Sequence, residues 1–186
     1  MNHAVTQGPA SESGVSGWEV RPARVDDAPA VAAAVAVLLE ELGGKAPAIE
    51  AIESEARAHI EDPSLGIVLV APATSSQKPA DSAENCELDG EGGELVGVLT
   101  ASWARAIQVA GRLLTIEVLW TRREWRDRRV GAGLVEALAS AAAAEGAGRV
   151  EVGLPREGFP ALRATERFYL ANGFERLGPR MRRAVP

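Results

Sequence analysis

The segment from Arg112 to Leu138 constrains the fold of this 186-residue chain more than any other. Its first part, up to Thr121, is an apolar run typical of a buried strand, and its last part has the spacing of an amphipathic helix. An arginine-rich loop that ends in glycines joins the two. A strand that enters a helix through such a loop directs backbone N–H groups and the positive end of the helix dipole at one point. The segment therefore predicts an anion site, most naturally for a phosphate.

The charged residues are distributed unevenly along the chain, whose formal net charge is −6. Residues 1–100 carry 17 acidic and 5 basic side chains, whereas residues 101–186 carry 9 acidic and 15 basic ones. The acidic total argues against nucleic-acid binding, and the basic second half suits a small polyanion. For the arginines outside the loop, a solvated surface is an equally good explanation.

What the chain lacks argues against other functional classes. No apolar run approaches the roughly 20 residues of a membrane span, and residues 1–17 have the composition of a disordered arm and not of a signal peptide. We therefore expect a cytoplasmic protein without membrane contact. The single cysteine, Cys86, excludes an internal disulfide, and with only two histidines, His3 and His59, we expect no metal site.

Apolar spacing and turn residues predict the order of the elements. Helices are expected over residues 26–42, 47–60, 130–145 and 161–171. Strands are expected over residues 18–21, 66–71, 94–102, 112–121, 149–154, 174–177 and 179–185. The polar stretch over residues 74–93 has little to bury, which predicts a long mobile hairpin loop within one domain of residues 18–186.

This order predicts an α/β protein of the mixed α+β type. Hairpins join the strands before the central segment, and two βα units follow it. We therefore expect a mixed, mostly antiparallel central sheet with helices on both faces. Within the strand over residues 112–121, alternation places Glu117 on one face together with Thr115, Leu119 and Thr121.

Three segments resemble, in their order and spacing, the GNAT acetyltransferase superfamily. Residues 116–134 resemble its acetyl-CoA-binding segment, in which a strand and an E-Y/W-R turn precede Arg/Gln-x-x-Gly-x-Gly/Ala. Arg167-Phe-Tyr-Leu-Ala-Asn-Gly-Phe174 resembles its FYxxxGF segment, and Glu94-Leu-Val-Gly97 is similar to its third strand. The resemblance covers residues 18–185 and implies a single GNAT-like domain that uses acetyl-CoA as cosubstrate.

Two registers of the loop fit the family motif. Arg128-Arg-Val-Gly-Ala-Gly133 matches it literally, whereas an ungapped count from Trp125 gives Arg126-Asp-Arg-Arg-Val-Gly131. We prefer the second register because it also directs the apolar face of the following helix to the core. It puts Arg129 where the first glycine is usual, so Arg129 either tolerates the turn or adds a phosphate contact. Leu162 stands where the family usually has Asn, which removes one cofactor contact.

The loop has the charge and the small residues that coenzyme A, with its pyrophosphate and third phosphate, requires. Five arginines against two acids give it a local charge of +3, and arginine binds phosphate oxygens through bidentate donors. Small residues at the helix start allow a close backbone approach. A plain glycine turn with solvated arginines is the structural alternative. The expected cofactor residues are Leu119, Trp120, Thr121, Arg126, Asp127, Arg128, Arg129, Val130, Gly131, Ala132 and Gly133.

The resemblance also implies acyl transfer from a thioester to an amine. In the family, backbone N–H groups of the central strand, here near residues 119–121, stabilise the oxyanion. A tyrosine at the position of Tyr169, the only tyrosine of this chain, protonates the departing thiolate. A core aromatic with a satisfied hydroxyl is the alternative role for Tyr169.

Glu117 is the leading candidate for the base that deprotonates the ammonium, directly or through water. A carboxylate in a strand that is covered on both faces is costly unless it has a partner or lines a cleft. An ion pair with Arg105 or Arg112 is therefore the alternative role of Glu117. Glu151, on the next strand, is the second candidate for the base.

The sequence thus predicts an N-acetyltransferase that moves an acetyl group from acetyl-CoA to a primary amine of a small molecule or peptide by direct attack in a ternary complex. The acidic first half favours a cationic acceptor such as a polyamine, an aminoglycoside-like compound or a protein amine, unless these charges are plain helix surface. The acids concerned are Glu40, Glu41, Glu50, Glu53 and Glu55. A CoA-binding regulatory or structural module without turnover is the alternative function, and the final strands are a candidate for homodimer pairing.

Overall fold

The computed structural model describes residues 17–74, 89–90 and 93–178. Three sequence-based expectations lie outside these residues. They are the arm over residues 1–17, apart from its last residue, the strand over residues 179–185 with its dimer pairing, and the loop around Cys86 except for a two-residue strand, β3 (Asp89–Gly90).

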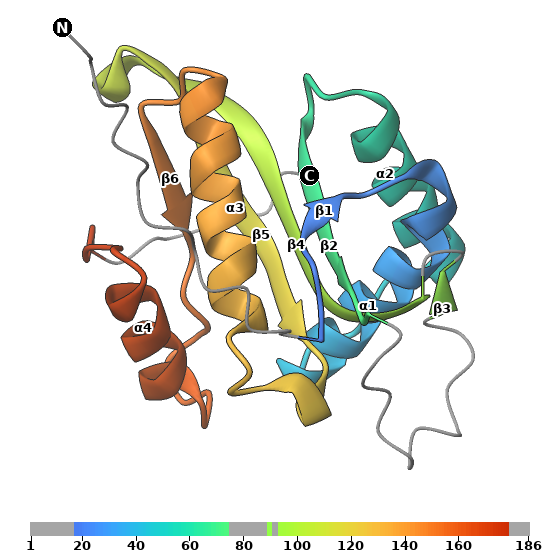
Figure 1. Cartoon of the computed structure of the whole chain (residues 1–186). Coiled ribbons are helices and arrows are strands. Elements are labelled where there is room, and N and C mark those ends of the chain that lie inside the picture. Colours follow the sequence, from blue (N-terminus) through green and yellow to red (C-terminus); the bar gives the residue numbers. More distant parts are fainter. Residues whose placement is uncertain (1–16, 75–88, 91–92, 179–186) are drawn as a thin grey trace, which may run out of the picture.

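One sheet organises the described part of the chain (Figure 1). Its strands follow the order β1-β2-β4-β5-β6, and β3 pairs with the start of β4. All neighbouring pairs are antiparallel except β5 with β6, which is parallel. The strand bounds are Arg21–Pro22 for β1, Gly66–Pro72 for β2, Gly93–Ala106 for β4, Gly111–Thr121 for β5 and Arg149–Val152 for β6.

Helices cover both faces of this sheet, as the sequence predicts. They are α1 (Ala28–Glu41), α2 (Ile49–Glu61), α3 (Val130–Ala144) and α4 (Leu162–Ala171). α1 and α2 pack on one face through a core cluster around Val31, Val70 and Trp120, whereas α3 packs on the other around Leu99, Leu114 and Leu134 (Figure 1). The mixed α/β class is therefore confirmed. No helix in the described ranges has the length and apolar character needed to cross a membrane.

A glycine in the sheet sets how closely α3 approaches it. A Cβ at Gly97 of β4 would lie 2.5 Å from Cγ1 of Val130 and 2.9 Å from Cδ1 of Leu134. Contacts that short do not occur, so only glycine allows the first turn of α3 to rest on β4. The close approach fixes the start of α3, and with it the end of the arginine-rich loop.

The two ends of the predicted strand order differ from the structure. Trp18 forms only an isolated bridge with Ala73, and the first strand is limited to β1. The strand predicted over residues 174–177 is wrong, because the chain leaves α4 through a turn and is irregular there. The N–H of Phe174 donates to the carbonyl of Tyr169 at 3.1 Å, and the two rings meet edge to face with centroids 5.2 Å apart.

Candidate active site

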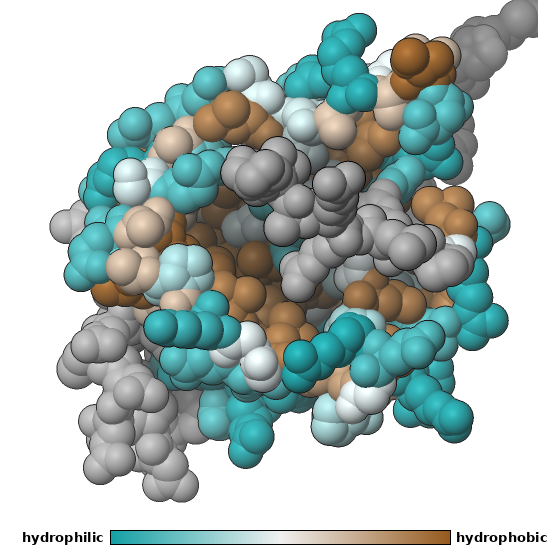
Figure 2. Space-filling view, turned by 180° about the vertical axis from the view of Figure 1, so that it is seen from behind, coloured by the Kyte–Doolittle hydropathy of each residue, from teal (hydrophilic) through white to brown (hydrophobic). Residues whose placement is uncertain are grey.

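A cavity of about 540 Å³ opens beside the second half of β5. Its walls come from the C-terminal end of α1, from β5 and the loop after it, from the start of α3, from the loop after β6 and from α4. The space-filling view from behind shows a hollow lined by apolar side chains and bordered by hydrophilic ones (Figure 2). Segments that are far apart in the sequence therefore enclose one chamber.

The cavity forms where β5 and β6 separate. The two strands pair from Leu113 with Arg149 to Ile116 with Val152. β6 ends there, whereas β5 continues to Thr121 (Figure 1). Beyond Ile116, this edge of β5 has no strand partner within the described ranges. Its alternate backbone N–H and C=O groups are therefore available to a ligand that lies along the edge.

A β-bulge places Glu117 at this opening. Thr100 of β4 pairs with Val118, and the next residue, Ala101, pairs with Ile116, so Glu117 is the extra residue of β5. Its side chain is exposed and lines the cavity. Bulges often re-aim a side chain next to an active site, and here the bulge gives the carboxylate access to the chamber.

The bulge also corrects the expected alternation along β5. Leu114 and Ile116 face the α3 side before the bulge, whereas Leu119 faces that side after it. Thr115 therefore does not share a face with Leu119, as strict alternation predicts. The ion pair considered for Glu117 is not formed with any described residue, and the guanidinium of Arg112 instead lies 3.9 Å from the ring centroid of Trp103.

The loop after β5 has an unusual backbone. It is anchored by the buried side chain of Trp125, and it then passes through two residues with positive φ, Asp127 at 67° and Arg129 at 63°. Such a conformation costs a non-glycine residue roughly 1–2 kcal/mol. Arg129 is the N-cap of α3, and no side chain caps the helix. The first N–H groups of α3 therefore point out of the helix without an internal partner.

Nine of the eleven predicted cofactor residues line the cavity. Their positions favour the second register of the motif, because Arg126 lies on the wall whereas Arg128 and Gly133, the two ends of the first register, do not. Arg129, at the first-glycine position, has the left-handed conformation that a glycine would adopt there. The nine residues are Leu119, Trp120, Thr121, Arg126, Asp127, Arg129, Val130, Gly131 and Ala132.

The two remaining cofactor candidates lie off the cavity wall. The guanidinium of Arg128 lies 4.9 Å from the ring centroid of Trp125, and the backbone carbonyl of Arg128 accepts a hydrogen bond from Trp18 Nε1 at 3.2 Å. A Cβ at Gly133 would lie 2.5 Å from the Trp18 ring. Gly133 thus makes room for Trp18, which is a packing role.

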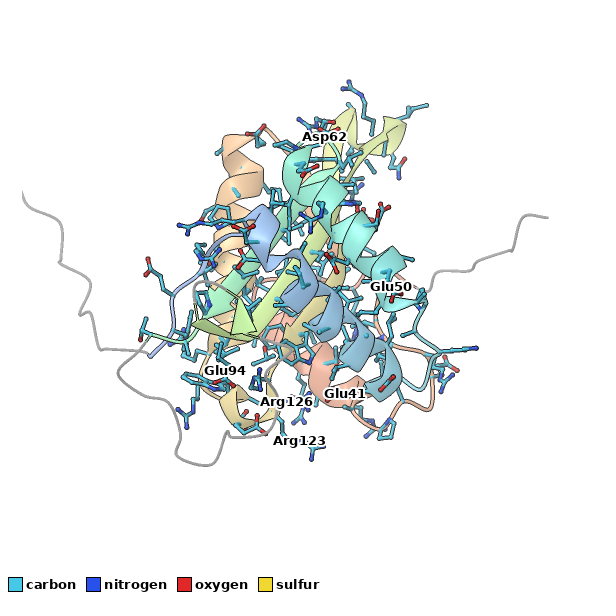
Figure 3. All side chains as sticks on the ribbon, turned by 90° about the vertical axis from the view of Figure 1, so that its right-hand side faces the viewer. Glu41, Glu50, Asp62, Glu94, Arg123 and Arg126 are labelled. Carbon is cyan, nitrogen blue, oxygen red and sulfur yellow. The ribbon has the colours of Figure 1, made fainter. Side chains whose placement is uncertain are left out.

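Arg126 connects the loop to α1. Its Nη2 donates to both carboxylate oxygens of Glu41 at 2.7 and 2.9 Å, and its Nε donates to the carbonyl of Thr121 at 3.2 Å. Figure 3 shows the two labelled residues close to each other, Glu41 at the end of α1 and Arg126 in the loop after β5. Both line the cavity, and both are partly exposed. The pair therefore lies where an anionic ligand of the loop would compete with Glu41.

Tyr169 is buried, yet no described residue satisfies its hydroxyl. The residue is 7% exposed and packs between the rings of Phe168 and Phe174, with both centroid distances at 5.2 Å. Burial raises the pKa of Tyr169 to about 12. The hydroxyl makes no hydrogen bond to a described residue, and Tyr169 lines the cavity. This placement favours the proton-transfer role over the satisfied core aromatic.

The second candidate for the base lies elsewhere. Glu151 is buried, and its Oε1 lies 3.2 Å from Nε of Arg149. Its neighbour in β6, Val152, lines the cavity, but Glu151 does not. The geometry therefore favours Glu117. Across the described ranges, no three His, Cys, Asp or Glu side chains are grouped so that they could hold a metal ion.

Sequence reasoning did not single out the individual side chains that α1 and the loop after β6 contribute. The apolar spacing predicts Leu38 and Leu42 only as core residues, and Glu41 is named from the sequence only as one of the acids that favour a cationic acceptor or form plain helix surface, but all three line the cavity. Pro155 and Phe159 line it as well. No local signal marks these five residues, because tertiary packing alone brings them to the chamber.

A sequence model of the Acetyltransferase (GNAT) family matches residues 53–174, which is more than half of the chain. This range holds the whole of β5, the arginine-rich loop, the start of α3 and Tyr169. The chain therefore belongs to the GNAT acetyltransferase family. No curated protein matches the chain significantly.

Solved structures share the fold. A possible acetyltransferase from Clostridium difficile 630 superposes with a TM-score of 0.68 at 17% identity and covers 91% of this chain and 98% of its own. Glucosamine-6-phosphate N-acetyltransferase from Arabidopsis thaliana gives 0.61 at 13% identity, with 91% and 99% covered. An aminoglycoside acetyltransferase from an uncultured soil metagenomic sample gives 0.65 at 18% identity, also with 91% and 99% covered. At these identities the similarity shows a common fold and not a common acceptor.

Proposed function

We propose that this protein is an acetyl-CoA-dependent N-acetyltransferase that acts on a primary amine by direct attack in a ternary complex. Family membership supports acetyltransferase activity. The observation that carries the proposal is the continuity of the cavity. One chamber runs from the uncapped start of α3, along the open edge of β5, to Glu117 and Tyr169. An anion site, an edge for an extended chain and two proton-transfer groups are therefore contiguous.

The residues of this chamber fit coenzyme A. Arg126, Arg129 and the free N–H groups of the first α3 turn offer charge and donors to a pyrophosphate. Gly131 leaves the helix wall without a side chain at the cavity. The unpaired edge of β5 offers backbone partners to the two amides of the pantetheine arm, in the way that an exposed strand edge binds a peptide.

Each chemical task has a candidate group in the chamber. Bound acetyl-CoA supplies an acetyl thioester. Glu117 accepts the proton of the acceptor ammonium, directly or through water. Backbone N–H groups of β5 over residues 119–121 stabilise the developing oxyanion. The Tyr169 hydroxyl donates a proton to the thiolate, and its raised pKa of about 12 keeps it protonated at neutral pH.

The residue types of the cavity fit direct attack by the amine, because neither a cysteine nor a histidine is among the described residues that line it. Of its two threonines, Thr165 donates its hydroxyl to the carbonyl of Ala161 at 3.1 Å. Direct attack by the amine needs only a base and an oxyanion site, both of which the chamber offers.

The test is a steady-state assay of thiol release from acetyl-CoA with a panel of primary amines, with mass spectrometry of the product. We expect an amine to gain one acetyl group and the double-reciprocal plots at several amine concentrations to intersect. Glu117→Gln is expected to lower kcat by about 10²-fold, within the usual range of general-base catalysis. Raising the pH should restore part of this lost activity. At higher pH more of the amine is already deprotonated in solution, so that the reaction depends less on Glu117 as a base.

Two results would contradict the proposal. Parallel double-reciprocal lines would indicate a covalent intermediate and rule out direct attack. Saturable acetyl-CoA binding without acetylation of any amine would instead support a CoA-binding module without turnover.

A further inference from the structure

Trp18 does not line the cavity, but it contacts the arginine-rich loop. Figure 1 shows the chain before β1, in blue, at the end of the sheet where β5 enters this loop. The backbone around Trp18 is fixed to the end of β2. The carbonyl of Gly17 accepts from the N–H of Thr74 at 2.8 Å, and the N–H of Glu19 donates to the carbonyl of Pro72 at 3.3 Å. The sheet therefore holds the indole in place beside the loop.

The indole of Trp18 fits into a space that Gly133 of α3 leaves open. A Cβ on Gly133 would lie 2.5 Å from Cη2 and 2.8 Å from Cζ3 of the ring. The polar edge of the same ring reaches the loop, because Nε1 donates to the backbone carbonyl of Arg128 at 3.2 Å. One side chain thus touches both the first turn of α3 and the loop before it.

Arg128, which accepts this hydrogen bond, is the middle residue of the strained turn. It lies between Asp127 and Arg129, the two residues of the loop with positive φ. Its N–H donates to the carbonyl of Trp125 at 3.4 Å, and its guanidinium lies 4.9 Å from the ring centroid of Trp125. Two tryptophans therefore hold Arg128, one from within the loop and Trp18 from the chain before β1.

The hydrogen bond from Trp18 also orients the next backbone N–H group. The peptide bond between Arg128 and Arg129 is trans. In a trans peptide the carbonyl and the N–H point in opposite directions. Since the carbonyl of Arg128 is directed at Trp18, the N–H of Arg129 is directed away from it. This N–H makes no hydrogen bond with a described residue, and Arg129 lines the cavity. Backbone N–H groups of such turns bind phosphate oxygens, so this N–H is available to an anionic ligand.

We propose that Trp18 is a positioning residue for the cofactor, because it holds the turn over residues 127–129 in the conformation that binds the pyrophosphate of coenzyme A. Trp18 acts through Arg128 and does not touch the ligand. This inference rests on the proposed acetyltransferase function, since it requires coenzyme A to bind at this loop.

The turn needs such support because its backbone is unfavourable by itself. A left-handed conformation is costly for residues other than glycine, and two of the three residues in this turn adopt it. Without the hydrogen bond from Trp18, the loop populates other conformations. The apparent affinity for a phosphate ligand then falls in proportion to the fraction of molecules that can bind it. A ligand without phosphates is not affected.

A matched pair of ligands tests this role, namely coenzyme A and pantetheine, which is the thiol arm of coenzyme A without its phosphates and nucleotide. Trp18→Phe removes the Nε1 donor but keeps an aromatic ring beside Gly133. We expect the dissociation constant of coenzyme A, measured by calorimetry, to rise about 5-fold in this variant. The dissociation constant of pantetheine, measured by NMR titration, should change less than about 2-fold.

Three further variants connect the effect to the contact. Trp103→Phe removes a half-buried indole that does not line the cavity, and as the control it should change the affinity for coenzyme A less than about 2-fold. Gly133→Ala places a Cβ against the ring of Trp18 and should also weaken the binding of coenzyme A. In the double variant with Trp18→Phe the two losses should not add, because both substitutions break the same contact.

The outcomes distinguish this inference from the function on which it rests. If the wild type and Trp18→Phe bind coenzyme A equally well, Trp18 does not position the loop and the proposed function stands. If Trp18→Phe weakens coenzyme A and pantetheine by the same factor, or if the losses in the double variant add, Trp18 supports the fold and not the phosphate site. If the wild type binds no coenzyme A at millimolar concentration, the proposed function fails and this inference fails with it.

Discussion

Each end of helix α1 carries an ion pair between an arginine and a carboxylate, and the two pairs differ in burial. At the N-terminal end, the oxygens of Asp27 accept from Arg21 at 2.6 and 2.9 Å, and the Asp27 side chain is only 3% exposed. At the C-terminal end, Glu41 accepts from Arg126 at 2.7 and 2.9 Å, but these side chains are 37% and 43% exposed. The hydrogen bonds of the two pairs are almost equally short, but the first pair is buried and the second is largely exposed to solvent.

Because of this difference in burial, we call the Arg21–Asp27 pair the structural pair and the Arg126–Glu41 pair the exchangeable pair. Removal of one partner from a buried pair leaves an uncompensated charge and costs about 3–5 kcal/mol. An exposed pair contributes roughly 0–1 kcal/mol, because water and salt screen it. α1 is therefore fixed at its N-terminal end. At its other end, beside the cavity, Arg126 can leave Glu41 for a phosphate at little cost.

The largest expected effect is on the structural pair. Asp27→Asn should lower the free energy of unfolding by about 3 kcal/mol, because Arg21 loses its charged partner and the N–H of Arg24 loses a carboxylate acceptor at 2.7 Å. Chemical denaturation measures this loss. Asp26→Asn, at the exposed neighbouring residue, is the control and should change stability by less than about 0.5 kcal/mol. Equal effects of the two substitutions would contradict the structural role.

The same pair should give the stability a pH dependence. Burial acts to raise the pKa of Asp27, but the hydrogen bonds from Arg21 and from the Arg24 N–H outweigh it and hold the pKa below 3.8. Because the pKa is lower in the folded state, the stabilisation is present above the unfolded value of about 3.9 and is lost as the pH falls through the folded pKa. Wild type should therefore lose stability on acidification below about pH 4 more steeply than Asp27→Asn. If the stability of the two proteins falls in parallel with pH, the lowered pKa of Asp27 is not the cause of the pH dependence.

Tyr169 is buried like Asp27, but its hydroxyl has no hydrogen-bond partner among the described residues and lies at the cavity. Tyr169→Phe should reduce kcat by about 10²-fold, the low end of the general-acid range, with little change in stability or in acetyl-CoA affinity. Because the pKa of Tyr169 is raised to about 12, wild type should show no loss of activity from tyrosine ionisation up to about pH 10. A stability loss without a loss in kcat would make Tyr169 a core residue.

A substitution at Arg129 tests whether the positive φ of this residue, in the turn next to Arg126, costs stability. Arg129→Gly should raise the free energy of unfolding by roughly 1 kcal/mol, because glycine adopts φ of 63° without the steric cost. Arg128→Gly removes the same charge at a residue without positive φ and should destabilise the protein. A fall in acetyl-CoA affinity in Arg129→Gly alone would show that Arg129 adds a phosphate contact, and an unchanged affinity would show that it only tolerates the turn.

The smallest expected effect is on the exchangeable pair. Glu41→Gln should strengthen acetyl-CoA binding about 3-fold, because the phosphate no longer competes with a carboxylate for Arg126. Its effect on unfolding should stay below about 0.5 kcal/mol. Glu40→Gln, the adjacent exposed carboxylate, is the matched control. Weaker binding in Glu41→Gln would instead mean that Glu41 positions Arg126 for the phosphate.

The fold was predictable because its signals are local. The apolar runs of β2, β4 and β5 and the helix spacing of α3 each specify an element from a few neighbouring residues. The segment over residues 174–177 shows the limit of such patterns. Its residues suit a strand, but a strand needs a partner edge, and the N–H of Phe174 bonds to the carbonyl of Tyr169 in α4 instead.

The candidate site was predictable where the family motif covers it. Nine of eleven cofactor residues line the cavity, whereas Gly133 packs against Trp18 and Arg128 lies over Trp125. The bulge at Glu117 has no mark in the sequence, because it depends on the register between β4 and β5. The contribution of α1, from Leu38 to Leu42, arises from contacts that only the folded chain makes.

Calorimetric titration with acetyl-CoA, at low and moderate salt, tests the central claim most directly. Arg126→Ala and Arg123→Ala remove the same charge from the same loop, but only Arg126 lines the cavity, and Figure 3 labels both side chains. We predict saturable, salt-sensitive binding that weakens about 10-fold in Arg126→Ala, as expected for the loss of a charge-assisted phosphate contact, and less than about 3-fold in Arg123→Ala. No binding at millimolar acetyl-CoA, or equal losses in both variants, would contradict the claim that this cavity is the cofactor site.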